Sequence, residues 1–301
     1  MERPYILHML TPGKQMSPFD INMAADAGWQ LVPTYTDVTL ESVMGLTQDA
    51  IFSRGPKGVA RTGLFIGGRD VLLAADMLER AKASMVKPFV VSAMADPSGS
   101  YTTAAAMVAC VEAKLKARGE SLKGQRVTIL GGTGTVGRIA GVLAAREGAL
   151  VVLSSRHGID VAEEAAKETG KRFDATLHGV SGGDREAVRR SIAEADVVLA
   201  TAAAGVQVVS AEDLGFAKQL KVAADVNAVP PEGIAGVGVM DDGKPLAGTQ
   251  AVCIGALAVG NVKYQTQHRL LVRMRETDKP VMLSFDAAFE VARGVLAEAK
   301  G

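Results

Sequence analysis

The sequence of 301 residues has little cysteine and no net charge. Its two cysteines, Cys110 and Cys253, lie far apart and each in an apolar segment, so we expect two buried thiols and neither a disulfide framework nor a CxxC metal site. Lys+Arg and Asp+Glu are equal at 33 each, so no global positive field attracts nucleic acid or an anionic membrane. A nucleic-acid or membrane-surface partner is therefore not expected.

Long hydrophobic runs are also absent. The N-terminal apolar patch is interrupted by His8 and Pro12, and no stretch approaches the roughly 18 apolar residues of a membrane span. The remaining histidines, His157, His178 and His268, show no HxxxH or HExxH spacing, so no protein-bound metal is expected. These absences favour a cytoplasmic protein without a metal.

The chain does contain a regular alternation of apolar strand-like runs and helix-like segments. With 48% hydrophobic residues it has ample material for a core, and the alternation predicts an α/β fold of two domains with largely parallel sheets. We expect an N-terminal α/β domain over residues 1–120 and a Rossmann-like doubly wound domain over residues 121–250, with a cleft between them. Residues 251–301 are expected to be helices that pack back on the N-terminal domain.

Some boundaries depend on short patterns. The run 50–52 (AIF) is grouped with the strand-like runs, and residues 252–276 and 285–300 are expected to be helices. The Gly- and Pro-rich segment 228–248 is expected to be loop and turn. Residues 96–103 (DPSGSYTT) supply N-cap candidates for a long helix that follows.

A glycine-rich loop, GGTGTVG, follows the predicted strand 127–130 and opens a helix. Its GxGxxG glycines are Gly132, for a tight turn, Gly134, for close approach to a pyrophosphate, and Gly137, for helix–strand packing. A Walker A loop requires lysine directly after the last glycine, whereas Arg138 stands there. The loop predicts a dinucleotide site, and the alternative is a glycine turn that binds nothing.

The second strand of this unit ends in Ser154, Ser155 and Arg156, where an NAD-selective site usually has a carboxylate. Two hydroxyls and a guanidinium favour the 2′-phosphate of NADP, with NAD weakened rather than excluded; the alternative is a solvated loop arginine. Asn227 follows a later strand, at the sheet edge where ligands bind. The predicted cofactor-binding residues are Gly132, Thr133, Gly134, Thr135, Val136, Gly137, Ser154, Ser155, Arg156 and Asn227.

One catalytic motif is missing. No tyrosine is followed four residues later by lysine, which disfavours alcohol dehydrogenases of the Tyr–Lys type. Removing hydride from a carbon between two nitrogens gives a resonance-stabilised cation and needs no base for a hydroxyl proton. The absence of an evident base fits this second chemistry.

Segments along nearly the whole chain together resemble the NAD(P)-dependent methylene-tetrahydromethanopterin dehydrogenases of methylotrophic bacteria. They are SPFD (17–20), SRGPKG (53–58), FIGGRD (65–70), DPSGSYTTAAA (96–106), GGTGTVG, ADVNAVPPEGI (224–234) and GALAVGNVK (255–263). The resemblance implies an N-terminal pterin-side domain, a nicotinamide domain and a homo-oligomer, a trimer or hexamer. The more distant methylene-tetrahydrofolate dehydrogenases share the two-domain plan.

The resemblance also implies site residues. Phe19 and Asp20 fall where the family binds the pterin, with Phe19 packing on the ring and Asp20 accepting hydrogen bonds from it; a helix cap is the alternative for Asp20. Lys263 resembles the family lysine near the pterin, with a snorkelling surface lysine as the alternative. Asp20 and Lys263 are the residues assigned to catalysis.

Ser100, Thr102 and Thr103 are expected to meet the substrate at the start of the long helix, although simple N-capping explains one of them. The reaction that the resemblance implies is reversible hydride transfer from methylene-tetrahydromethanopterin to NADP or NAD, in one-carbon (formaldehyde) oxidation. The alternatives are a methylene-tetrahydrofolate dehydrogenase and a non-catalytic NADP-binding regulator.

Overall fold

The computed structural model describes residues 3–299 and divides the chain into two compact units. Unit 1 comprises the described residues up to Thr102 together with Tyr264–Val291, and unit 2 comprises Thr103–Lys263 and the chain from Ala292 onward. The first boundary differs from the expected position near residue 120 because it falls inside a continuous helix, which no loop marks in the sequence. The C-terminal segment 251–301 is shared between the two units.

Unit 1 is built on a five-stranded sheet in which every pair is parallel. Its strands, in the spatial order 2-1-3-4-12, are β1 (Ile6–Leu10), β2 (Thr34–Tyr35), β3 (Thr62–Ile66), β4 (Ser92–Ala95) and β12 (Met282–Leu283). Its helices are α1 (Pro18–Asp26), α2 (Ser42–Phe52), α3 (Gly55–Val59), α4 (Val71–Ser84) and the 3₁₀ turn Pro97–Gly99. The chain leaves β1 toward β2 and returns to the other side of β1 as β3, so the topological switch point lies between β1 and β3.

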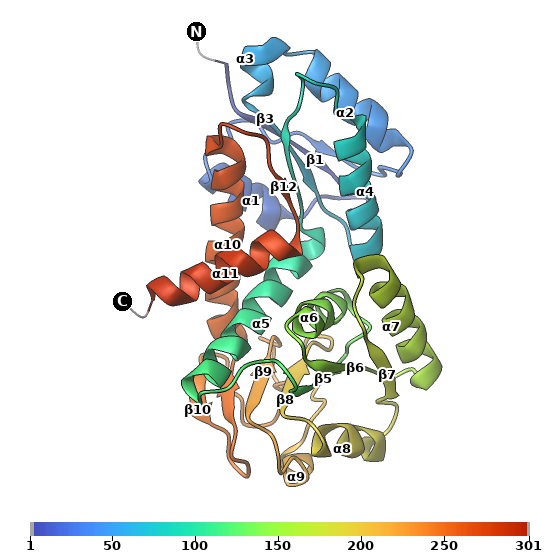
Figure 1. Cartoon of the computed structure of the whole chain (residues 1–301), viewed down its shortest axis with the longest axis vertical. Helices are drawn as coiled ribbons and strands as arrows, with labels where there is room; N and C mark the ends of the chain where they lie inside the picture. Colours follow the sequence, from blue (N-terminus) through green and yellow to red (C-terminus); the bar gives the residue numbers. More distant parts are fainter. Residues whose placement is uncertain (1–2, 300–301) are drawn as a thin grey trace. The chain divides into compact units, whose positions relative to one another are not determined.

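Local sequence explains the main elements of this unit. All five residues of β3 (TGLFI) are buried, as expected for a central parallel strand, and the Asp70 side chain caps α4 by accepting the N–H groups of Leu72 and Leu73 at 2.9 and 3.0 Å. α4 packs beside α2 (Figure 1). The interpretation of residues 50–52 as strand-like is wrong: they are the last turn of α2, because three apolar residues do not distinguish the two periods.

Unit 2 has a seven-stranded sheet in the spatial order 7-6-5-8-9-11-10, in which β10 is antiparallel and the rest are parallel. The strands are β5 (Arg126–Leu130), β6 (Leu150–Ser155), β7 (His178–Ser181), β8 (Val197–Ala200), β9 (Val222–Asp225), β10 (Asp242–Pro245) and β11 (Val252–Ile254). The helices are α6 (Thr135–Arg146), α7 (Ile159–Phe173), which packs along β6 and β7 (Figure 1), α8 (Arg185–Ala193) and α9 (Ala211–Leu214). This is the doubly wound order, and its switch point lies between β5 and β8.

Three helices contain a unit boundary: α5 (Ser100–Ala117), α10 (Ala256–Glu276) and α11 (Phe285–Glu298). The expected helix over residues 252–276 is wrong at its start, because residues 252–254 form β11, in parallel register with β9. The expected loop 228–248 likewise contains β10, which forms an antiparallel pair with β11. A three-residue apolar run is ambiguous in sequence, and its pairing with β9 decides its conformation. Within residues 3–299, no helix combines the length and apolarity that crossing a membrane requires.

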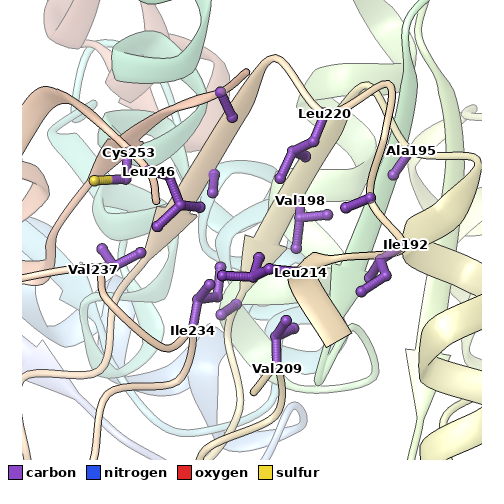
Figure 2. Packing of buried hydrophobic residues seen from close by; sticks show 14 of the residues in the cluster. Ile192, Ala195, Val198, Val209, Leu214, Leu220, Ile234, Val237, Leu246 and Cys253 are labelled. Atoms are coloured by element: carbon purple, nitrogen blue, oxygen red, sulfur yellow. The ribbon is translucent and has the colours of Figure 1, made fainter. Parts of the chain in front are cut away.

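A cluster of buried apolar side chains fills the part of unit 2 around β8, β9 and α9, including Val198, Leu214 and Ile234 (Figure 2). Cys253 belongs to this cluster and is fully buried; burial, together with the Asp241 carboxylate beside it, raises the pKa of its thiol to about 11. Burial likewise raises the pKa of Cys110, on α5, to about 12. Both cysteines are therefore buried thiols in the structure, as the sequence predicts.

The Asp213 carboxylate joins α9 to α8 in unit 2. It accepts hydrogen bonds from Arg189 Nε at 2.7 Å and Arg185 Nε at 3.2 Å, and Ser210 completes a capping box with it. Burial alone would raise the pKa of Asp213, but the bonds from Ser210, Arg189 and Arg185 outweigh burial and hold that pKa well below its ordinary value. The native state therefore favours the ionised carboxylate.

Because the folded-state pKa of Asp213 is depressed, its contribution to stability is present above the unfolded pKa of about 4 and is lost as the pH falls toward the folded value. We expect Asp213→Asn to lower Tm by about 2–4 °C at pH 7. The difference from the wild type should hold from pH 7 to about 5 and shrink as the pH is lowered from about 5 toward 2, measured by thermal unfolding. Glu212→Gln is the matched control, because it removes an exposed carboxylate that pairs with the same arginines, Arg185 and Arg189. An Asp213→Asn effect that does not change with pH would contradict the role of the ionised carboxylate.

Candidate functional sites

A pocket of about 320 Å³ lies in unit 2 at the carboxyl ends of β5, β6 and β8, which is the switch point of the sheet. It is lined by Leu130, Gly131, Thr133, Gly134, Ser154, Ser155, Arg156, His157, Gly182, Val188, Thr201, Ala202, Ala203, Val206 and Val208. Five of the predicted cofactor residues are in this set: Thr133, Gly134, Ser154, Ser155 and Arg156. The site therefore forms where a doubly wound fold places its ligand.

The glycine loop packs so closely against its own backbone that two of its positions admit only glycine. The residue with positive φ is Gly131, at 73°, so the tight turn falls one residue before the predicted Gly132. A Cβ at Gly132 would come within 2.7 Å of the Ile129 carbonyl oxygen, and one at Gly137 within 2.7 Å of the Gly132 Cα. Gly134 lines the pocket and precedes α6, whose N-terminal N–H groups favour negative charge. The loop fits the pyrophosphate of a dinucleotide.

At the end of β6 the side chains differ in exposure. Ser154 and Ser155 are buried and Arg156 is exposed. Ser155 Oγ accepts the N–H of His157 at 3.2 Å and retains its own proton for donation, while Arg156 Nε donates to His157 Nε2 at 3.1 Å. His157 thus forms a hydrogen bond with the guanidinium, a contact that the sequence did not suggest.

The other predicted cofactor residues lie outside the pocket lining: Gly132, Thr135, Val136, Gly137 and Asn227. Asn227 is 6% exposed and its side-chain amide binds backbone groups. The pocket instead includes residues after β7 and β8, namely Gly182, Thr201 and Ala202, which sequence analysis missed. The only feature of the sequence that could have indicated these residues is that they directly follow strands, at the carboxyl edge of the sheet where ligands bind.

Unit 1 has a larger pocket, of about 870 Å³, at its own switch point between β1 and β3. It is lined by Thr11, Pro12, Gly13, Lys14, Gln15, Met16, Ser17, Pro18, Asp20, Gly68, Arg69, Asp70, Leu73 and Ser98. Lys14 and Arg69 are exposed cations in this lining, and neither was predicted. Each follows a strand end, in TPGKQ after β1 and in GGRD after β3.

Asp20 is 2% exposed, yet it lines this pocket. It lies in the first turn of α1, and Gln267 Nε2 donates to its Oδ1 at 2.7 Å. The N-cap position belongs to Ser17, so capping is not what places this carboxylate. Phe19, beside it, is 47% exposed. A buried carboxylate in a pocket wall is suited to bind a ligand N–H group.

Two hydroxyls at the start of α5 form hydrogen bonds within the turn that precedes the helix. Ser100 Oγ donates to the Pro97 carbonyl at 2.5 Å, and Thr102 Oγ1 donates to Asp96 Oδ2 at 2.7 Å, while both side chains are fully buried. Asp96 Oδ1 also accepts the Thr102 N–H at 3.1 Å. Hydrogen bonds within the turn therefore account for two of the three predicted residues, while Asp96 is the residue that caps the helix. Thr103 is half-buried, and its contact with substrate stays a prediction.

Lys263 is half-buried on α10, four residues before Gln267, so the two side chains share one face of the helix. Its role near a pterin stays a prediction. In residues 3–299, no group of three or more His, Cys, Asp and Glu side chains is arranged to hold a metal ion.

Known proteins give three relevant likenesses. The family model "Methylene-tetrahydromethanopterin dehydrogenase, N-terminal" matches residues 18–98. An NAD(P)-dependent methylenetetrahydromethanopterin dehydrogenase of Methylorubrum extorquens is 51% identical over 288 residues, covering 95% of this chain and 97% of that protein. The bifunctional protein MdtA of the same organism is 34% identical over 271 residues, covering 90% and 91%.

Among solved structures, the ligand-free 5-ketofructose reductase of Gluconobacter sp. strain CHM43 aligns with a TM-score of 0.52 at 16% identity, covering 97% of this chain and 99% of that one. At this sequence identity, the structural similarity supports the assignment of the fold and says nothing about function. The doubly wound sheet and its glycine loop at the switch point define a Rossmann-type dinucleotide-binding protein. Within that class, the chain belongs to the family of NAD(P)-dependent methylenetetrahydromethanopterin dehydrogenases.

Proposed function

We propose that this protein catalyses reversible hydride transfer from methylene-tetrahydromethanopterin to NADP or NAD. The methylene C–H bond breaks, and its hydrogen leaves with both electrons for C4 of the nicotinamide. The pterin becomes a methenyl cation, whose charge is shared by the two flanking nitrogens. When bound, the cofactor supplies the hydride acceptor.

The residues of unit 2 bind and orient the cofactor. The N–H groups at the start of α6, beside Gly134 in the pocket lining, accommodate the pyrophosphate, and Arg156 accommodates a ribose 2′-phosphate. Asp20 and Phe19, in unit 1, accept hydrogen bonds from the pterin and pack on its ring, respectively, and Lys263 orients the pterin. The protein lowers the barrier by positioning the two reactants rather than by acid–base catalysis.

The observation that carries this proposal is 51% identity along nearly the whole chain to a relative named for the same reaction. It is tested by absorbance at 340 nm after mixing the protein with methylene-tetrahydromethanopterin and either NADP or NAD. Formation of NADPH supports the proposal. Tight cofactor binding with no turnover of the pterin would contradict it and would favour the regulator, while turnover of methylene-tetrahydrofolate alone would favour the folate enzyme.

We further propose that the protein is cytoplasmic and forms a homo-oligomer, a trimer or hexamer. The oligomer rests on resemblance to the family, and the cytoplasmic location rests on the interrupted N-terminal apolar patch. Sedimentation velocity at micromolar concentration tests the assembly, and a monomer at all concentrations would contradict it.

A further inference from the structure

The loop after β8, residues 201–208, forms one wall of the pocket in unit 2. At its start the Thr201 N–H donates to the Leu130 carbonyl at 2.8 Å. A Cβ on Gly131 would come within 2.7 Å of the Ala202 backbone, so the loop packs directly against the glycine loop. The position of residues 201–208 therefore sets the shape of the space beside the glycines.

The middle of this loop is held by Asn227. In the described chain, residues 202–207 make one backbone hydrogen bond to another segment, from the Gly205 N–H to Asn227 Oδ1 at 3.1 Å. The same oxygen accepts the Val229 N–H at 2.9 Å, and Asn227 Nδ2 donates to the Pro231 carbonyl at 2.8 Å. Both lone pairs of the amide oxygen are thus used inside the protein.

Asn227 is itself fixed by Asp225, which is 1% exposed at the end of β9. Asp225 Oδ1 accepts the Asn227 N–H at 2.9 Å, and its Oδ2 accepts the Ile234 N–H at 3.0 Å. A Cβ on Gly233 would lie 2.8 Å from this carboxylate, so glycine permits the close approach. The Gly233 carbonyl then accepts the Val208 N–H at 2.8 Å, which fixes the end of the pocket loop.

We propose that Asn227 is a positioning residue of the cofactor site: through Gly205 it holds the pocket loop, residues 201–208, where the dinucleotide binds. Asn227 does not line the pocket and acts through this loop. Because the loop borders the part of the pocket beside the glycines, its displacement weakens NADP and NAD alike. The inference rests on the proposed function only in taking this pocket as the NADP and NAD site.

Two substitutions of Asn227 separate its bonds. Asn227→Ser retains a short acceptor for the Val229 N–H, two residues on, and loses the reach to Gly205. Asn227→Asp retains the acceptor for Gly205 and loses the donor to Pro231. Dissociation constants of NADPH and NADH are measured by titration without any pterin, followed by kcat and KM in turnover.

We expect Asn227→Ser to raise both dissociation constants about tenfold, since one hydrogen bond is worth about a factor of ten. Asn227→Asp should leave both dissociation constants within about threefold of the wild-type values. In turnover, KM for the cofactor should rise more than kcat falls. Wild-type binding by Asn227→Ser, a loss confined to NADPH, or equal losses in both variants would each overturn the inference.

Thr249→Val is the matched control. Thr249 Oγ1 donates to the Leu246 carbonyl at 2.9 Å and accepts the Ala251 N–H at 3.1 Å, in the turn between β10 and β11 of the same unit. Its removal should leave both dissociation constants unchanged, and equal weakening would show that any loosening of unit 2 suffices, which overturns the inference. Absence of pterin turnover would contradict the proposed reaction while leaving these titrations interpretable.

Discussion

Replacing Asp20 by alanine is expected to lower kcat/KM for methylene-tetrahydromethanopterin by about 100-fold, because a hydrogen bond to a charged group contributes about 1.5–3 kcal/mol. Asp20 is buried in the wall of the unit 1 pocket, where its carboxylate can meet ring N–H groups. KM for NADP should change little, since the cofactor pocket is built from unit 2 residues. Steady-state kinetics with each substrate varied in turn measure both effects.

Asp26→Ala is the matched control for Asp20→Ala. Asp26 is an exposed carboxylate at the other end of the same helix, outside the pocket lining, so its removal should leave kcat/KM unchanged. Thermal unfolding of both variants separates lost stability from lost binding. If Asp20→Ala and Lys263→Ala both retain wild-type kcat/KM, the assignment of the pterin site is wrong.

Replacing Arg156 by alanine is expected to lower the ratio of kcat/KM for NADP to that for NAD by about 30-fold. Arg156 is the exposed guanidinium in the pocket at the end of β6, and its loss removes a charge-assisted bond that only the 2′-phosphate forms. The measurement is initial rates with each cofactor at saturating pterin. Affinity for adenosine 2′,5′-bisphosphate against 5′-AMP gives the same comparison without turnover.

Arg190→Ala is the control for Arg156→Ala, because Arg190 is an exposed arginine of unit 2 that pairs only with Glu186 among the ion pairs of the described residues. Its loss tests whether net charge alone changes the ratio. An equal loss of NADP and NAD activity in Arg156→Ala would place Arg156 against the adenine or in the fold, and the 2′-phosphate assignment would fail. Asn227→Ser is expected to weaken the binding of NADPH and NADH equally. That result distinguishes Asn227 from Arg156, whose loss should affect NADP more than NAD.

The candidate sites could be predicted in part. The glycines and the Ser154–Arg156 segment are contiguous in sequence and follow strands, so a local pattern sufficed to place them at a ligand edge. Thr201, Gly182 and Lys14 have no local motif, and Arg69 lies in FIGGRD, a segment that indicated the family but no role for this residue. They reach the pockets because parallel strands far apart in sequence end at the same edge of a sheet.

The function of a polar residue was harder to predict from the sequence than its position in the fold. Thr102 and Asn227 each carried a plausible ligand-binding interpretation, yet their polar atoms bind Asp96 and Gly205 inside the protein. Nothing in the sequence shows whether a polar group is already satisfied, because its partner is chosen by packing. The start of β11 is a similar case, since its pairing with β9 converts an apolar run from an expected helix into a strand.

The α/β class, the dinucleotide loop, the buried cysteines and the family follow from the amino-acid sequence, because each depends on local periodicity, glycine spacing or similarity along the chain. The tertiary structure alone decided the strand orders, both switch points and the linkage of Asn227 to the pocket loop. These features depend on contacts between distant segments. Such contacts form only when burial and backbone hydrogen bonding are satisfied across the whole sheet.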